Sequence, residues 1–447
     1  MRRTTVLAAL AAMLITMLPA VALARGADEW SQYQKDAGHG GAIDIALPSS
    51  NKVMRRTAAL NAVDGSQPVV AGDRAYFLAG TAGADGKVYC FDLRTGRQVW
   101  TRAVGVISGM ESWSSPAIAD GVVYTASGSM IHALNSSTGA VLWTKDLKTI
   151  KATADVVNSS PAIDGGKLVI GDFTNGCYYC LDLKQQGKHL WTFSLEANTM
   201  AIGTAAIDGG RVYVVQSAAL GAPVFPNGKV WCVDESTGKA VTSWGTDGAF
   251  TTVNKIDVCC APALYGDFIY FTDFIYANNL HFDAANPSSY LYCLNKHTGA
   301  EAWKVKTYGT EGAVSVSDGT IVVSGQQPAV WPDVGTNKTV AFNADTTLGQ
   351  KPVRRWLRDG IGGPNMSVCI GKYGRIAVGN NATSGFPPVV STDTYVLDIA
   401  TGNTVWHSTE GGSSPVPTQY GLLSIADGRM VTFGSGGLPA GEFYFAE

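Results

Sequence analysis

Short apolar runs separated by glycine-rich turns repeat along the chain, and one pattern recurs seven times. It consists of a β-prone run, a polar turn and a second run that ends in tryptophan, as in VYCFDLRTGRQVW at 88–100. Runs of this length and composition are typical of strands rather than helices. The copies lie at 88–100, 131–143, 178–191, 230–244, 291–303, 339–356 and 394–406. Each copy is therefore predicted to be two antiparallel strands joined by a tight turn.

Three positions of this pattern have a physical role. Asp or Asn begins every turn, where its side chain can bond the backbone two residues on. Glycine follows where the turn needs a positive φ. Tryptophan supplies a large buried area on the second strand, and so has a structural role. The turn residues are Asp92, Asn135, Asp182, Asp234, Asn295, Asn343 and Asp398, and the tryptophans are Trp100, Trp143, Trp191, Trp244, Trp303, Trp356 and Trp406.

A second, shorter hairpin precedes each of these copies and occurs eight times, as in PAIADGVVYT from Pro116 and PAIDGGKLVI from Pro161. Together the two hairpins make a unit of four strands, here called A to D. Repeated four-stranded units predict a β-propeller. The eighth unit lacks strand D, which the segment 51–60 near the other end of the chain can supply. The sequence thus predicts an all-β fold, a single eight-bladed propeller over 51–447 whose last blade is shared by both ends.

The first 24 residues have the form of a secretory signal. Arg2 and Arg3 precede an apolar run that ends at Ala22-Leu23-Ala24, and such a small-residue site favours cleavage over retention as a membrane anchor. We expect a signal peptide at 1–24, a lead-in at 25–50, and export to the periplasm or the cell exterior with no transmembrane anchor. The 33 basic and 36 acidic residues leave no basic surplus for nucleic acid.

The long connections should gather on one face of the ring. Turns between strands A and B and between C and D are short, whereas the B–C connections of units 4 to 7 are long, at 217–228, 273–289, 325–337 and 380–393. Long loops on a rigid scaffold often bind ligands. We predict that a protein or small-molecule ligand binds this face, unless the aromatic side chains only pack their own loops. The candidates are Phe225, Phe274, Tyr276, His281, Phe282, Trp331 and Phe386.

The Asp/Asn-x-x-Thr-Gly-x-x-x-Trp pattern resembles the repeat of the pyrroloquinoline quinone (PQQ) propeller superfamily. The segment EWSQYQKDAGHGG at 29–41 is similar to the lead-in of its exported members. The resemblance implies a propeller over most of the chain but no single activity. The superfamily includes calcium-dependent quinoprotein alcohol dehydrogenases and also the non-enzymatic propeller of the outer-membrane barrel-assembly machinery.

Two adjacent cysteines, Cys259 and Cys260, stand at the head of strand A in unit 5, where units 2 and 3 hold serines in similar stretches. Their resemblance to the cysteine pair of quinoprotein alcohol dehydrogenases implies a vicinal disulfide against bound PQQ. Such a bridge is strained, because neighbouring Cα atoms lie only ~3.8 Å apart. The alternatives are two small core residues, or one cysteine paired with Cys369.

Other candidate chemistry is sparse. One repeat position holds small residues that we interpret as buried and apolar, namely Cys90, Cys180, Cys232 and Cys293. Four residues near the heads of A strands could point toward the axis, namely Trp113, Asn158, Glu311 and Asn365. No histidine adjoins a nucleophile with an orienting group, and no metal site is predicted from the protein alone. The sequence therefore favours a binding scaffold, with a PQQ- and calcium-dependent oxidoreductase as the alternative.

Overall fold

The computed structural model describes most of the chain from Glu29 onward. The described residues are 29–50, 53–56, 64–80, 85–106, 114–155, 157–219, 227–253, 257–274, 289–326, 336–345, 349–363, 368–380, 390–391, 394–407, 413–414, 423–426, 429–435 and 441–446. The signal peptide predicted at 1–24 lies outside them. Within these ranges there is no helix of the length and apolar character needed to cross a membrane.

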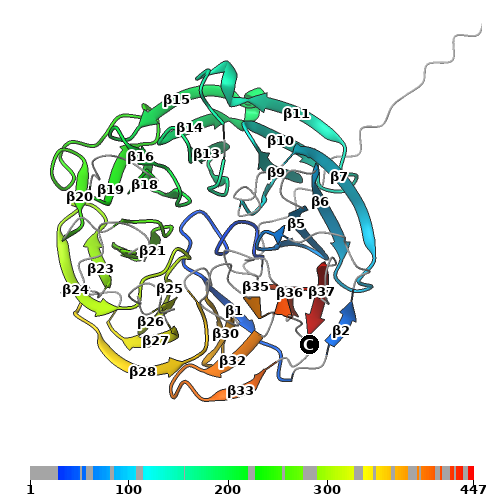
Figure 1. The fold of residues 1–447 in the computed structure, drawn as a ribbon, viewed down its shortest axis with the longest axis vertical. Coiled ribbons are helices and arrows are strands. Elements are labelled where there is room, and N and C mark those ends of the chain that lie inside the picture. Colours follow the sequence, from blue (N-terminus) through cyan, green and yellow to red (C-terminus); the bar gives the residue numbers. More distant parts are fainter. Residues whose placement is uncertain are drawn as a thin grey trace, which may run out of the picture.

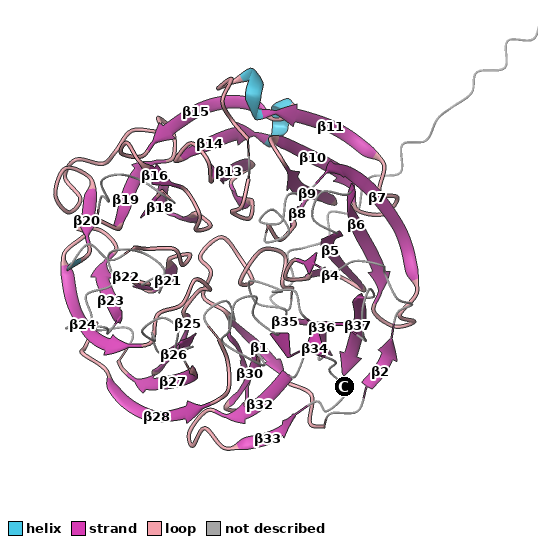
Figure 2. Cartoon of the chain, in the orientation of Figure 1, coloured by secondary structure: helices cyan, strands magenta, loops and turns pink. Residues whose placement is uncertain are grey.

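The described strands form eight sheets of four or five strands, arranged as blades around an axis (Figures 1 and 2). Blade 1 has β3 (Asp64–Gly65), β4 (Val69–Ala71), β5 (Arg74–Gly80), β6 (Asp85–Asp92) and β7 (Gln98–Val106). Blade 2 has β8 (Ala117–Ala119), β9 (Val122–Ser127), β10 (Met130–Asn135) and β11 (Val141–Asp146). Blade 3 has β12 (Ala162–Asp164), β13 (Lys167–Asp172), β14 (Cys177–Asp182) and β15 (Lys188–Ser194). Blade 4 has β16 (Thr199–Met200), β17 (Ala206–Asp208), β18 (Arg211–Ala218), β19 (Lys229–Asp234) and β20 (Ala249–Thr251).

The remaining blades repeat this plan. Blade 5 has β21 (Ala263–Tyr265), β22 (Phe268–Thr272), β23 (Ser289–Asn295) and β24 (Glu301–Thr307). Blade 6 has β25 (Ser315–Ser317), β26 (Thr320–Gln326), β27 (Asn337–Asn343) and β28 (Val353–Asp359). Blade 7 has β1 (Ala42–Ala46), β29 (Val368–Lys372), β30 (Arg375–Gly379), β32 (Thr394–Asp398) and β33 (Thr404–His407). Blade 8 has β35 (Leu423–Ala426), β36 (Arg429–Ser435), β37 (Gly441–Ala446) and β2 (Val53–Arg56). A small pair, β31 (Val390–Ser391) and β34 (Ser413–Ser414), and two short 3₁₀ turns, η2 (Leu147–Thr149) and η3 (Leu183–Gln185), complete the described elements.

Ring closure uses both ends of the propeller. Strand β2 pairs antiparallel with β37, with Arg56 opposite Tyr444, and becomes the outermost strand of blade 8. The segment predicted at 51–60 therefore closes the last blade, and the eight sheets are consistent with the predicted eight blades. Closure in this way joins the first and last segments of the ring without an open seam.

The repeated Asp, Gly and Trp form one latch between neighbouring blades. The turn carboxylate binds its own turn, as where Asp92 Oδ1 accepts from the backbone N–H groups of Arg94 and Thr95. In four copies the indole N–H donates to a backbone carbonyl in the corresponding turn of the next blade, as from Trp191 to Glu235 at 2.8 Å. The turn glycine lies against the same indole, since a Cβ on Gly238 would lie 2.5 Å from Trp191. Glycine is therefore needed for the packing as well as for its φ of 70°.

The core lies between facing blades, where apolar side chains of adjacent sheets interlock. Blades 4 and 5, for example, bury Tyr213, Trp244, Phe271 and Tyr292 in one cluster. The structure corrects one detail here. Trp244 was expected on strand D, but it lies in a turn before β20, because the extra residues of VTSW form a turn in which Gly248 N donates to the Trp244 carbonyl.

The lead-in is part of the ring and crosses its centre before β1 (Figure 1). Trp30 is fully buried and pairs with Val70 of blade 1. Strand β1 runs parallel to β29, the inner strand of blade 7, with Ala42 opposite Ile370. Residues 29–47 thus pack against the innermost strands of the propeller.

Candidate functional site

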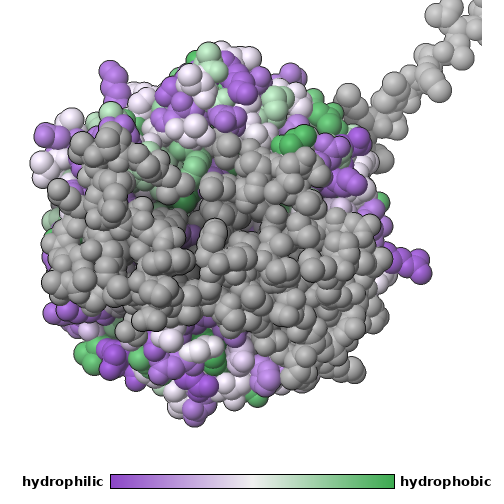
Figure 3. Space-filling view, in the orientation of Figure 1, coloured by the Kyte–Doolittle hydropathy of each residue, from purple (hydrophilic) through white to green (hydrophobic). Residues whose placement is uncertain are grey.

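The candidate site is a small space on the axis, at the heads of the A strands. In Figure 3 the described residues on the rim of this face are mixed hydrophilic and hydrophobic, and the centre of the ring lies between them. The described residues leave about 10 Å³ of free space there, which is roughly the room of one water molecule. The lining residues are Tyr33, Asn158, Ser160, Ile202, Gly203, Thr204, Cys259, Ala261 and Glu311.

Three polar side chains reach this space from the same repeat position in three blades. Asn158, Cys259 and Glu311 each stand three residues before the first residue of an A-strand hairpin, in blades 3, 5 and 6. All three are buried. Both amide atoms of Asn158 lack a hydrogen-bond partner among the described residues, so a bound water or ligand group is expected beside them. The expectation that Asn158 and Glu311 point toward the axis is confirmed, whereas Trp113 and Asn365 lie outside the described residues.

Cys260 replaces a serine in a contact that other blades make with a hydroxyl. In blades 1 and 3, Ser66 Oγ accepts the backbone N–H of Leu78, and Ser159 Oγ accepts that of Gly171. In blade 5 the Cys260 sulfur takes the same place, 3.3 Å from Thr272 N and 3.2 Å from Thr272 O. This cysteine is therefore a core residue that holds strand A to strand B.

The structure does not support a vicinal disulfide. Cys259 and Cys260 are both free thiols, and Cys369 is free and buried as well. Cys259 Sγ lies 3.1 Å from Ser217 Oγ, away from the Thr272 contact of its neighbour. Successive side chains of an extended segment point to opposite sides, so one thiol faces the axis and the other the blade. The alternative of small buried residues is the one that the structure bears out.

Burial keeps these thiols protonated. It raises the pKa of Cys259 well above its usual value, and the nearby carboxylates of Asp257 and Glu311 raise it further. Burial also raises the pKa of Cys260 to about 12. The thiolate is the reactive form of cysteine, so neither side chain is prepared for nucleophilic attack. The four cysteines of the repeat are likewise buried and free, as predicted for Cys90, Cys180, Cys232 and Cys293.

The described residues around Cys259 leave no room for PQQ beside its sulfur. Sites for ligands of that size commonly need ~300 Å³ or more, against the space of one water found here. Tyr33 of the lead-in lines this space, and its hydroxyl accepts the backbone N–H of Ala313 at 3.2 Å. Among the described residues, no three His, Cys, Asp or Glu side chains gather as a metal site would require. Among the described residues, the space beside Cys259 is therefore too small for the quinone contact suggested for Cys259 and Cys260.

The predicted ligand face is described only at the bases of its loops. Phe225, Tyr276, His281, Phe282, Trp331 and Phe386 lie outside the described residues. Phe274 is buried, and its backbone N–H donates to the Asp257 carbonyl at 2.9 Å. Phe274 therefore packs within the fold, which agrees with the alternative that such aromatics stabilise their own loops.

Sequence reasoning missed Tyr33 and His39, which lie in the lead-in and pack edge to face with ring centroids 5.6 Å apart. His39 is fully buried, and its Nδ1 lies 3.3 Å from the Pro262 carbonyl. No repeat marks these residues, because the lead-in occurs only once. In the sequence they are marked only by ring side chains with polar groups, in a segment of mostly small and polar residues.

The buried imidazole of His39 makes stability fall in acid. Burial lowers the pKa of His39 to about 4, below its value of ~6.5 in an unfolded chain. The unfolded chain therefore takes up a proton first as the pH falls from 6.5 to 4, and the folded state loses about 3 kcal/mol. In urea unfolding, we expect His39→Asn to gain about 3 kcal/mol relative to the unmodified chain between pH 7 and pH 4, since asparagine does not titrate in this range and tolerates the φ of 55°. The exposed control His407→Gln should show no such relative gain, and an equal change for the two variants would refute the assignment.

Comparison with known proteins places the chain among propellers of related repeat. A family described as outer membrane protein assembly factor BamB matches residues 24–246. Tetrathionate hydrolase of Acidithiobacillus ferrooxidans is 26% identical over 71% of this chain and 63% of its own length. BamB of Burkholderia pseudomallei is 28% identical over 62% of this chain and 64% of its own length. The structure of a europium-containing methanol dehydrogenase superposes with a TM-score of 0.66 at 12% identity, covering 95% of this chain and 99% of that one.

The fold is a β-propeller, and the repeats and these similarities support a PQQ-repeat-like propeller. The chain resembles both BamB and the quinoprotein alcohol dehydrogenases, and it spans less than two thirds of the length of the tetrathionate hydrolase and BamB relatives. The similarity to solved structures concerns the fold alone, because the sequence identity is low.

Proposed function

We propose that this chain is an exported, non-catalytic scaffold that binds a protein partner through its loop-rich face. The observation that supports the proposal is the space beside Cys259, which Tyr33 of the lead-in lines and where the described residues leave room for about one water. The name of the BamB relatives, outer membrane protein assembly factor, also fits a protein-binding role. The partner would contact Phe225, Tyr276, His281, Trp331 and Phe386.

Site-specific photo-crosslinking in the producing cell tests this proposal. A photoreactive amino acid at Tyr276 or Phe386 is expected to capture one or a few discrete proteins. The matched controls carry it at Lys184 or Ser236, which are exposed in the turns on the opposite face. Capture of the same proteins from the control positions, or from none of the four, would contradict the proposed face.

Hydrolysis of a tetrathionate-like sulfur compound is a second candidate. It is favoured by the similarity to tetrathionate hydrolase over 71% of this chain and by the presence of a thiol and a carboxylate, Cys259 and Glu311, in one axial space. The protonated state of Cys259 argues for the scaffold instead. Incubation of the purified protein with tetrathionate separates the two candidates. Release of thiosulfate that Cys259→Ser abolishes and Cys293→Ser retains would establish the second, and no release agrees with the first.

A further inference from the structure

Residues 29–41 contact the innermost strands of seven blades, in sequence from blade 1 to blade 7. In each blade the central residue of strand A donates its backbone N–H to this segment, over distances of 2.7 to 2.8 Å. The pairs are Val70 with Trp30 O, Ile118 with Ser31 O, Ile163 with Gln32 Oε1, Ile207 with Ala37 O, Leu264 with Gly38 O, Val316 with Gly40 O, and Ile370 with Gly41 O. Immediately afterwards the chain forms β1 and then β2.

These seven donors are equivalent groups of the repeat. Each A strand uses the residues on either side of its centre to pair with strand B, as where Val69 lies opposite Tyr76 and Ala71 opposite Arg74. The N–H of the central residue therefore points away from strand B and toward the axis. An inner strand edge of this kind is a ready template for another extended chain. The propeller thus presents a ring of backbone donors, one from each of these blades.

The lead-in meets this ring almost entirely with its backbone. Six of the seven acceptors are main-chain carbonyls. The seventh is the side chain of Gln32, which imitates a peptide group by accepting from Ile163 N at 2.7 Å and donating to Ile163 O at 2.9 Å. Gln32 and Lys35 bond each other's backbone in a tight turn, so the carbonyls of residues 33–36 do not accept from the A strands, and Tyr33 lines the axial space.

We propose that the inner edges of these seven A strands form one polypeptide-binding site, and that residues 29–41 are its intramolecular ligand. The site recognises mainly the backbone carbonyls of its occupant, and Gln32 is the one side chain that replaces a carbonyl in this set of hydrogen bonds. Residues 29–41 contact seven blades at once, and the chain that follows them provides β2 of blade 8. The ligand and the strand that closes the ring therefore belong to one continuous segment.

Two neighbouring glycines provide a matched pair of variants. Gly41 has a φ of 64°, and a Cβ there would lie 2.5 Å from Ser315 Oγ and 3.2 Å from the Val368 carbonyl. Gly40 has ordinary space, since the nearest atoms to an added Cβ are 3.9 Å away. Alanine should therefore disrupt the contact at position 41 and be accepted at position 40.

The binding test uses the whole chain with a protease site inserted between Ser49 and Ser50, which are both exposed. After cleavage the N-terminal segment should stay bound in gel filtration, and a labelled synthetic peptide of residues 28–49 should exchange with it. A peptide with Gly41→Ala should bind at least tenfold more weakly, and one with Gly40→Ala within about twofold of the parent. Loss of the segment from a ring that stays folded, or equal binding of the two variants, would overturn the proposal.

Hydrogen exchange on the uncut chain decides the matter if cleavage unfolds the ring. The seven A-strand amides should be protected, and Gly41→Ala should speed exchange at all of them, including Val70 and Ile118 on blades 1 and 2. Gly40→Ala should leave them unchanged. Faster exchange confined to Val316 and Ile370, next to the substitution, would show seven separate contacts instead of one site.

Discussion

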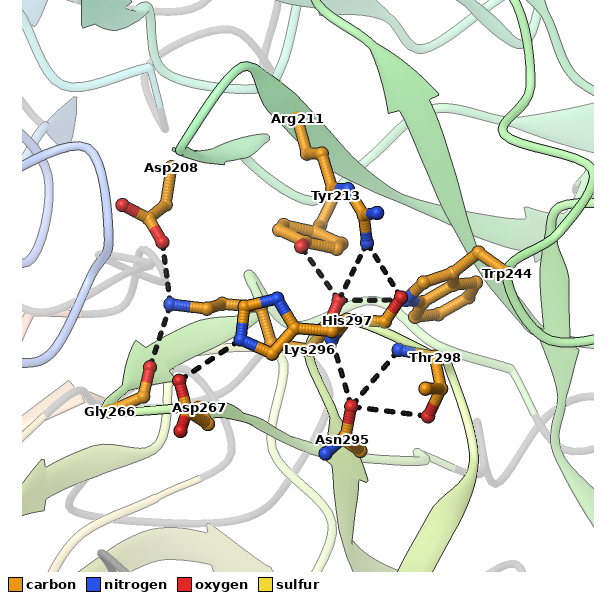
Figure 4. Close-up of polar contacts among 10 residues, drawn as sticks. All are labelled: Asp208, Arg211, Tyr213, Trp244, Gly266, Asp267, Asn295, Lys296, His297 and Thr298. Carbon is orange, nitrogen blue, oxygen red and sulfur yellow. Dashed lines mark hydrogen bonds and ion pairs between the residues drawn. The ribbon is translucent and has the colours of Figure 1, made fainter.

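Replacing Trp244 with alanine is expected to lower the free energy of unfolding by about 4 kcal/mol. The indole is fully buried between blades 4 and 5 and lies against Gly299, where an added Cβ would come within 2.6 Å of the ring. Its Nε1 donates to the Lys296 carbonyl at 2.9 Å. Figure 4 shows that the same carbonyl also receives Tyr213 and Arg211. The substitution therefore leaves a cavity and removes the hydrogen bond to the Lys296 carbonyl. Chemical denaturation would measure the resulting loss in the free energy of unfolding.

The control for this prediction is the same residue type at the equivalent position of blade 2. Trp143 is only partly buried, so Trp143→Ala should cost about half as much. Trp244→Phe should cost about 1–2 kcal/mol, because it keeps most of the buried area and loses the indole donor. Equal losses for Trp244→Ala and Trp143→Ala would show that burial between the blades is not what the tryptophan contributes.

The repeat could be predicted because it is carried by side chains with distinct conformational roles. Asp or Asn at the turn, glycine after it and tryptophan beyond the glycine can each be recognised in the sequence. Their recurrence in seven copies makes the pattern clear. The closing strand was also predictable, since the last unit lacked a strand and a spare β-prone segment existed near the other end. The contact between the turn glycine and a tryptophan was not predictable, because the two residues belong to different blades.

The axial site was less predictable for physical reasons. The lead-in binds through backbone carbonyls, and backbone groups leave no pattern in a sequence. Cys260 was assigned to a possible quinone site by resemblance, whereas its sulfur makes the contact that Ser159 makes in blade 3. Trp244 lies outside its expected strand because the additional residues next to it form a turn. A repeat therefore fixes the architecture, while single insertions and unique segments decide what occupies its centre.

Stability should also depend on pH through Asp273, which follows β22 and is fully buried. Burial raises the pKa of Asp273 to about 7, despite hydrogen bonds from Tyr290 N and Tyr292 Oη and the more distant charge of Lys304 that act in the other direction. The same carboxyl titrates at ~3.9 in an unfolded chain. Its contribution is therefore fully present below pH 4 and is lost as the pH rises through 7, to an extent of about 4 kcal/mol.

The asparagine variant isolates this effect from other titrating groups. Asp273→Asn stays neutral, and its amide can accept from Tyr290 N and donate to the Tyr292 hydroxyl. We expect it to match the unmodified chain at pH 4 and to exceed it by up to about 4 kcal/mol at pH 9 in urea unfolding. The control Asp234→Asn lies in an exposed turn where Ser236 and Thr237 lower the pKa of the carboxyl, and Asn135 and Asn295 already stand at the same repeat position. That control should show no gain at pH 9, and a constant difference between Asp273→Asn and the unmodified chain across the pH range would mean that Asp273 does not titrate in this window.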